Sequence, residues 1–195
     1  MSISPQAQLT SERKRRAFTV HEYHRMGETG VLTPEDRTEL IDGDIVQMTP
    51  MGSRHAGIVA TLNKYFVEQA KERYILFPQL PVRLGTFSEP QPDLLLLKAR
   101  KDFYTSALPT SQDVLLIIEV SESSLKFDHS VKIPLYAKHG VKEVWIIDAG
   151  AGKVEVYRKP GKMGYLEVRT YKRGDSITLS QIKGMNVAVS EFLKK

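Results

Sequence analysis

Two short apolar runs, each bounded by an acidic residue, constrain the fold of this chain most strongly. Leu94–Leu97 follows Asp93, and Val114–Ile118 precedes Glu119. Runs of roughly four to eight large aliphatic residues without polar alternation are typical of strands that are buried on both faces of a sheet. If the two strands are neighbours, the acid that begins one and the acid that ends the other meet at one edge of the sheet. The pattern therefore predicts a central sheet with two carboxylates gathered at one edge.

Two carboxylates at a sheet edge suit a divalent metal ion. Hard cations such as Mg²⁺ take oxygen ligands and need only a few protein carboxylates. A metal held there activates water and stabilises the transition state of phosphodiester hydrolysis. The alternative is that Asp93 and Glu119 are solvated residues at strand ends, where acids are common. The spacing by itself leaves both interpretations open.

The remaining pattern predicts an α+β fold with helices packed beside the sheet. Thr19 and Glu22 have capping-box spacing, which predicts a short helix that runs to about Gly27. The turn Asp42-Gly43 between apolar residues predicts a β-hairpin over residues 39–48. Further helices are expected at 53–73 and 127–139, and strands at 74–78, 81–84, 94–98, 114–120, 144–148, 153–158 and 165–171. Pro134 lies inside the second helix, where its missing N–H predicts a bend.

Composition places the chain among globular proteins and excludes several site chemistries. The absence of cysteine rules out disulfides and thiolate zinc sites and suits a cytoplasmic setting. No apolar stretch is long enough to span a membrane, and the N-terminus has no signal-like apolar segment. We expect residues 1–17, which contain the basic run Arg13–Arg16, to form a flexible tail ahead of a single domain at 18–195.

The charge of the chain is unevenly distributed. The net charge is +5, but residues 151–195 carry ten Lys/Arg against four Asp/Glu, whereas residues 17–150 carry fourteen against eighteen. The acidic part contains the predicted carboxylate pair, and the basic parts flank it. A basic surface around an acidic centre suits a phosphate-bearing partner such as DNA. A chance asymmetry of a solvated surface would give the same counts.

Other site chemistries have weaker support. His21 and His24 share a helix face, but no third ligand of defined spacing accompanies them, so zinc is disfavoured. Neither a phosphate-binding P-loop motif nor a nucleophile elbow is present. The single tryptophan, Trp145, lies in an apolar strand and is expected in the core rather than on a carbohydrate platform. Four further acids are interpreted as turn and strand-end residues: Asp42, Asp44, Asp128 and Asp148.

Taken in order, these motifs resemble the Uma-type restriction endonuclease family, a branch of the PD-(D/E)XK nuclease superfamily. The residues that carry the resemblance are Glu39 in ELIDGD, Arg54-His55 at a helix start, Pro92-Asp93, Glu119-Val120-Ser121, and Lys132 in FDHSVKIPLYAKHGVKEVWIID. The likeness extends over roughly residues 18–192. It implies a restriction-endonuclease-like core, with a mixed central sheet flanked by helices and an additional antiparallel C-terminal hairpin region. It also implies Mg²⁺-dependent cleavage of phosphodiester bonds, with Mn²⁺ as a substitute.

The resemblance assigns roles to individual residues. It makes Asp93 and Glu119 the metal-binding acids, together with the backbone carbonyl of Val120, and Glu39 a supporting acid. The superfamily pattern places a lysine two residues after the glutamate, but this chain has Ser121 there. In this branch the lysine has moved to the following helix, at Lys132, from where a flexible ammonium can reach the site.

Three further expectations follow from the same residues. His55 is a candidate phosphate contact near a helix N-terminus, where backbone amides favour anions. A homodimer would suit cleavage of both strands of a duplex, although the C-terminal strands could equally complete the core of a monomer. The competing function is a nucleic-acid-binding or interaction module that keeps the fold without useful turnover, because the lysine expected at position 121 is missing.

Overall fold

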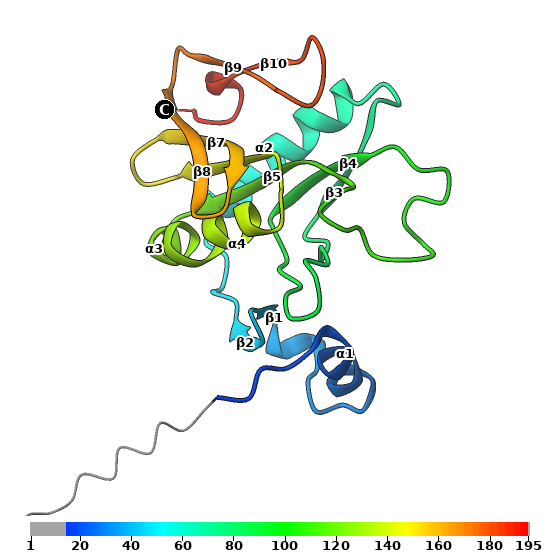
Figure 1. Cartoon of the computed structure of the whole chain (residues 1–195). Helices are drawn as coiled ribbons and strands as arrows, with labels where there is room; N and C mark the ends of the chain where they lie inside the picture. Colours follow the sequence, from blue (N-terminus) through cyan, green and yellow to red (C-terminus); the bar gives the residue numbers. More distant parts are fainter. Residues whose placement is uncertain (1–14, 195) are drawn as a thin grey trace, which may run out of the picture.

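The structure is a computed structural model that describes residues 15–194, and it is built around one mixed β-sheet. The sheet has six strands in the order β3-β4-β5-β6-β7-β8 (Figure 1). The strands are β3 (Tyr74–Pro78), β4 (Leu94–Lys98), β5 (Val114–Ser121), β6 (Glu143–Asp148), β7 (Lys153–Gly161) and β8 (Gly164–Lys172). Only β5 and β6 run parallel, and every other neighbouring pair is antiparallel. The predicted α+β class with a mixed central sheet is confirmed.

The two apolar runs form adjacent central strands. Leu94 pairs with Ile118 and Leu96 with Leu116 in the antiparallel β4–β5 ladder. All four leucines of β4 are fully buried, because layers of structure cover both faces of the sheet. The side chains alternate, so Leu94 and Leu96 enter one core cluster and their neighbours enter the other.

One face of the sheet is covered by α2 (Ser53–Gln69) and the C-terminal segment. Ile58, Leu62 and Phe66 of α2 lie one helical turn apart and pack against Trp145 of β6. The C-terminal segment adds β9 (Ser176–Thr178), β10 (Asn186–Ala188) and η3 (Val189–Glu191) to the same face. The core position predicted for Trp145 is therefore confirmed. The antiparallel strands predicted at 153–158 and 165–171 are β7 and β8 of the central sheet, and the pair β9–β10 was not predicted.

A continuous helical run covers the other face. It comprises α3 (Leu125–Phe127), the π-helical turn η2 (Asp128–Lys132) and α4 (Ile133–Lys138). Pro134 lies in the first turn of α4, directly after the wider π turn, and this local change in helical hydrogen bonding accommodates its missing backbone N–H. The helix expected at 127–139 is thus present, and the local response to Pro134 is a π turn. Asp128 and Lys132, at the two ends of that turn, are both buried.

The N-terminal part of the described chain forms a small hairpin unit beside the sheet. It contains α1 (Val20–Glu28), η1 (Pro34–Asp36), β1 (Thr38–Ile41) and β2 (Asp44–Gln47), which lie together at the end opposite β9–β10 (Figure 1). Thr19 and Glu22 make the predicted capping box. Asp42 and Gly43 both have positive φ, 46° and 87°, as a tight hairpin turn requires. A Cβ at position 43 would lie 2.5 Å from that of Ala17, so only glycine fits there.

One of the expected strands is absent, and the expected N-terminal tail lies mostly beyond the residues that the structure describes. The strand expected at 81–84 is wrong: that segment forms only an isolated bridge at Arg83, because its backbone bonds go to the loop at 88–90 and to Pro109. The predicted tail at 1–17 lies mostly outside the described residues. Among residues 15–194, no helix combines the length and apolar character needed to cross a lipid bilayer.

Candidate active site

A cavity of about 310 Å³ lies where the β1–β2 hairpin, the edge of β4 and β5, and the π turn converge. Glu39 enters it from β1, Glu119 from β5, and Lys132 from the end of η2. Asp93, immediately before β4, also lines it. The four residues that the sequence singled out as catalytic therefore share one cavity. The lining includes His55 and Val120 as well.

Asp93 is held rigidly at the start of β4. Its Oδ2 accepts a hydrogen bond from the backbone N–H of Val120 at 2.8 Å, and its Oδ1 lies 3.0 Å from Nε2 of His55. The first contact ties the acid before β4 directly to the end of β5. The hydrogen bond to Asp93 raises the pKa of His55, with a smaller opposing effect of burial. His55, expected as a phosphate contact, is thus placed by the structure against the predicted metal-binding acid.

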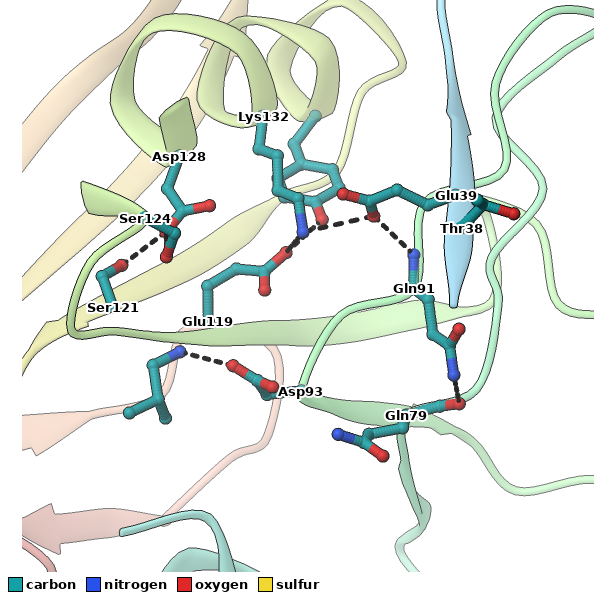
Figure 2. A network of polar contacts seen from close by, with 12 residues as sticks. Thr38, Glu39, Gln79, Gln91, Asp93, Glu119, Ser121, Ser124, Asp128 and Lys132 are labelled. Atoms are coloured by element: carbon teal, nitrogen blue, oxygen red, sulfur yellow. Dashed lines mark hydrogen bonds and ion pairs between the residues drawn. The ribbon is translucent and has the colours of Figure 1, made fainter. Parts of the chain in front are cut away.

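Lys132 reaches the acids from the helical layer. Its Nζ lies 3.2 Å from Oε1 of Glu119 and 3.2 Å from Oε2 of Glu39 (Figure 2). Only 6% of Lys132 is exposed. Burial by itself disfavours the ammonium, but the negative charges of Glu119 and Glu39 raise the pKa of Lys132 above its usual value. The lysine is therefore a buried, charged group shared between two carboxylates.

Glu119 is almost completely buried, like Glu39. Its Oε1 also accepts a hydrogen bond of 2.5 Å from the hydroxyl of Tyr136 on α4. Burial raises the pKa of Glu119; the ammonium of Lys132 opposes this rise, and nearby acids add to it. Within residues 15–194 the second oxygen, Oε2, accepts no hydrogen bond. This unpaired oxygen on a cavity-lining acid is the kind of group that a cation would satisfy.

Glu39 is fixed by the loop that precedes Asp93. The backbone N–H of Gln91 donates to Glu39 Oε2 at 3.1 Å, and the Gln91 side chain donates to the carbonyl of Gln79 at 2.6 Å (Figure 2). Glu39 is 4% exposed and sits on β1, which pairs with β2. The hairpin thus delivers one acid to the cavity and the loop at Gln91 holds it in place.

Asp128 is a cavity residue that the sequence reasoning missed. It was interpreted as a turn acid, but it is 3% exposed and lines the same cavity. Its Oδ2 accepts hydrogen bonds from Ser121 Oγ at 2.6 Å and Ser124 Oγ at 2.7 Å. The sequence feature that could have indicated this position is the i, i+4 spacing of Asp128 and Lys132, which places both side chains on one side of a helix. Ser121, at the position vacated by the lysine, therefore serves to hold Asp128.

The donor set fits a magnesium-like ion in its chemistry. Among residues 15–194 no cluster of three or more His, Cys, Asp or Glu is arranged to hold a metal. Mg²⁺, however, commonly keeps several waters and binds through one or two carboxylates together with substrate phosphates. Asp93 and Glu119 line one cavity and supply two such carboxylates, one of them with an unpaired oxygen. The Val120 carbonyl stays a predicted ligand, since the structure assigns a contact only to its N–H.

Comparisons with known proteins point to one family. A family model named Uma2 and described as "Putative restriction endonuclease" matches residues 20–190. A crystal structure titled as a "putative nuclease belonging to DUF820" from Anabaena variabilis ATCC 29413 aligns with a TM-score of 0.65 at 18% sequence identity, covering 90% of this chain and 97% of that one. At that identity the structural likeness establishes the fold. No curated protein matches the chain.

Proposed function

Because the chain belongs to the Uma2 family of restriction-endonuclease-like nucleases, we propose that it is a divalent-metal-dependent DNA endonuclease. The observation that carries the proposal is the contact of Lys132 with both Glu39 and Glu119 inside the cavity that Asp93 lines. Two acids and a lysine in one polar cavity are the groups that phosphodiester hydrolysis needs. The reaction adds water across a phosphorus–oxygen ester bond and releases a phosphate monoester and an alcohol.

Each residue has a separate task in this proposal. Asp93, Glu119 and the Val120 carbonyl would hold Mg²⁺, or Mn²⁺ in its place. The ion, when bound, lowers the pKa of water and offsets the negative charge of the phosphate. Lys132 orients the attacking water and stabilises charge that develops on the phosphate oxygens. Glu39 holds the Lys132 ammonium in place and positions water beside it.

His55 is the proposed link between the acid and the substrate. Its ring lines the cavity and contacts Asp93, which favours the protonated form. A positive ring beside Asp93 fixes that carboxylate and places a cation near the phosphate of the substrate. His55 lies in the first turn of α2, where the unpaired backbone amides also favour an anion.

A second candidate function is a DNA-binding module without turnover. The observation that favours it is Ser121, which occupies the position where the superfamily pattern has a lysine and donates a hydrogen bond to Asp128 instead. A site without that lysine would bind DNA and leave it intact.

Supercoiled plasmid incubated with Mg²⁺ or Mn²⁺ separates the two functions. We expect the wild-type chain to nick it, Asp93→Asn to reduce the rate by about a hundredfold or more, and the exposed-acid variant Glu72→Gln to retain it. EDTA should abolish nicking by the wild-type chain. Binding without nicking would favour the module, and nicking that survives unchanged in Asp93→Asn would remove the proposed site.

The proposal includes a homodimer that forms through β8, the free edge strand of the sheet. Leu166 and Val168 on this strand are 80% and 52% exposed, which is unusual for large apolar side chains on an edge. Antiparallel pairing of two copies of β8 centred on Val168 would place each Glu167 opposite an Arg169. The strand is thus complementary to itself in both apolar character and charge.

A further inference from the structure

We propose that a second cavity next to the candidate active site binds the sugar–phosphate backbone of the DNA strand on one side of the cleaved bond, and that Arg37 contacts a phosphate there. This inference rests on the proposed nuclease function and extends it by naming the path of the substrate. It gives the N-terminal hairpin unit a role in binding the substrate as well as in supplying Glu39.

The second cavity is larger than the first and shares two lining residues with it. Its volume is about 670 Å³, and its walls come from α1, the 3₁₀ turn η1 and the start of β1. Arg37 and Gln91 line both cavities. Gln91 is also the residue whose backbone N–H holds Glu39. The two cavities therefore adjoin at Arg37 and Gln91, next to an acid of the candidate site.

Arg37 stands at this junction in an unusual backbone conformation. Its φ is 46°, in the left-handed region that side chains other than glycine seldom adopt. The preceding turn is fixed by Asp36, which accepts hydrogen bonds from the backbone N–H and the hydroxyl of Thr33. The carbonyl of Arg37 accepts a bond from the N–H of Met48 on the other side of the hairpin. A rigid frame thus holds the arginine in a backbone conformation that glycine would adopt more easily and that several other non-glycine residues of this chain share.

The charges around the groove explain why an arginine is needed there. Glu39, Asp93, Glu119 and Asp128 line the first cavity and repel a phosphate. Lys132 is buried and paired with two of these acids. Arg37 is exposed, and among the described residues no acid lies within ion-pair distance of it. It is therefore an available cation at the entrance to an acidic site, and a guanidinium binds phosphate through two hydrogen bonds.

The floor of the second cavity is organised by polar contacts that hold its shape. The hydroxyl of Tyr23 donates to the carbonyl of Thr38 at 2.8 Å, which fixes α1 to the start of β1. His24 lies over the buried carboxylate of Glu89, with 2.6 Å between Nε2 and Oε1. Tyr23, His24 and Thr38 all line the cavity. These contacts fix the shape of the wall; Glu89 is paired with His24, and the acid Glu28 lines this cavity.

Binding of a fluorescein-labelled DNA duplex in EDTA, followed by anisotropy at several NaCl concentrations, tests this inference without any cleavage. Arg37→Gly removes the side chain at a position where glycine is the easier residue, so folding is preserved. We expect Kd to rise about tenfold and the slope of log Kd against log salt to fall by about one. Arg37→Lys should recover part of the affinity. Arg73→Ala removes an exposed arginine that lies outside the basic region 151–195 and lines neither cavity, and it should leave Kd unchanged.

The outcomes separate this inference from the proposed function. A wild-type chain that binds without nicking, together with weaker binding by Arg37→Gly, would support the groove and contradict the nuclease. Equal Kd and equal salt slope for Arg37→Gly and Arg73→Ala would overturn the groove even if plasmid nicking is observed. The absence of duplex binding by the wild-type chain at low salt would overturn it too.

Discussion

The Nζ of Lys132 lies 3.2 Å from Oε1 of Glu119, although the two residues are thirteen positions apart in the chain and come from different layers. Glu119 points from β5 toward the helical run that covers this face, and the π turn presents Lys132 to it. A lysine two residues after the glutamate would project from the same strand face. The fold therefore offers two routes for an ammonium to the same carboxylate, and this chain uses the helical one.

Replacing Lys132 should impair both cleavage and stability. Lys132→Met leaves Glu39 and Glu119 buried without a counter-charge, which should cost roughly 3–5 kcal/mol in the free energy of unfolding. Plasmid nicking should slow by about 10²–10³-fold. Urea denaturation and nicking rates measured well below the melting temperature check both effects.

Two further variants make this result interpretable. Lys132→Arg keeps the charge and most of the stability. It should still nick slowly, because a planar guanidinium cannot take the place of the compact ammonium between Glu39 and Glu119. Lys126→Met replaces an exposed lysine of the same helical run, and this variant should behave as the wild type. Full activity in Lys132→Met would show that the lysine has no catalytic role.

Moving the lysine back to the strand should restore activity in part. Ser121 lies on the same strand face as Glu119, and its hydroxyl contacts Asp128 in the cavity. We expect Ser121→Lys combined with Lys132→Met to nick at least about tenfold faster than Lys132→Met alone, since the new ammonium can pair with Asp128 beside Glu119. A double variant no faster than the single one would mean that the strand position no longer reaches the substrate.

A buried acid outside the cavity should affect stability alone. Glu143 on β6 accepts hydrogen bonds from Trp145 Nε1 at 2.9 Å, Arg158 at 2.8 Å and the Ser180 N–H at 2.7 Å. It thereby ties the C-terminal segment to the sheet. Glu143→Gln should lower the free energy of unfolding by roughly 3–5 kcal/mol, because the half-buried Arg158 loses its partner. The nicking rate per folded molecule should stay within about twofold, as measured at low temperature after a denaturation curve.

The proposed β8 dimer predicts a mass in solution twice that of the chain. Val168 would lie opposite its own copy, so Val168→Lys places two like charges together and should give monomers. Val67→Lys, at a similarly exposed valine on α2, should leave the dimer intact. Light scattering across a range of concentrations checks this. A wild-type chain that stays monomeric at every concentration, with DNA present, would contradict the interface.

Much of the fold could be predicted from local pattern. The bounds of β3 and β4 match the predicted ranges, because Tyr74–Pro78 and Leu94–Lys98 are delimited by polar and turn residues. The hairpin at Asp42-Gly43 followed from a turn that only particular residues allow. The segment at 81–84 failed because its apolar residues, Val82 and Leu84, enter the core from a loop that has no strand to pair with. A buried loop segment that pairs with no strand has the same apolar sequence pattern as a short strand.

Of the residues that line the cavity, only those near strand ends could be predicted from the sequence. Asp93 and Glu119 flank apolar runs, so their meeting followed from strand adjacency. Asp128 and Tyr136 were missed because their approach depends on how the helical run packs, and the π turn before Pro134 sets which side chains face inward. The groove at Arg37 was equally hidden, since it arises between the hairpin unit and the loop at Gln91. Contacts between layers leave no regular period in the sequence.

The initial rate of Mg²⁺-dependent plasmid nicking by Glu119→Gln, compared with Glu143→Gln, tests the central claim most directly. Both variants alter a buried glutamate on adjacent central strands, but only Glu119 lines the cavity with Lys132. We predict that Glu119→Gln nicks at least about a hundredfold more slowly than the wild type, while folded Glu143→Gln nicks at close to the wild-type rate. Equal rates for Glu119→Gln and the wild type would contradict the assignment of this cavity as the nuclease centre.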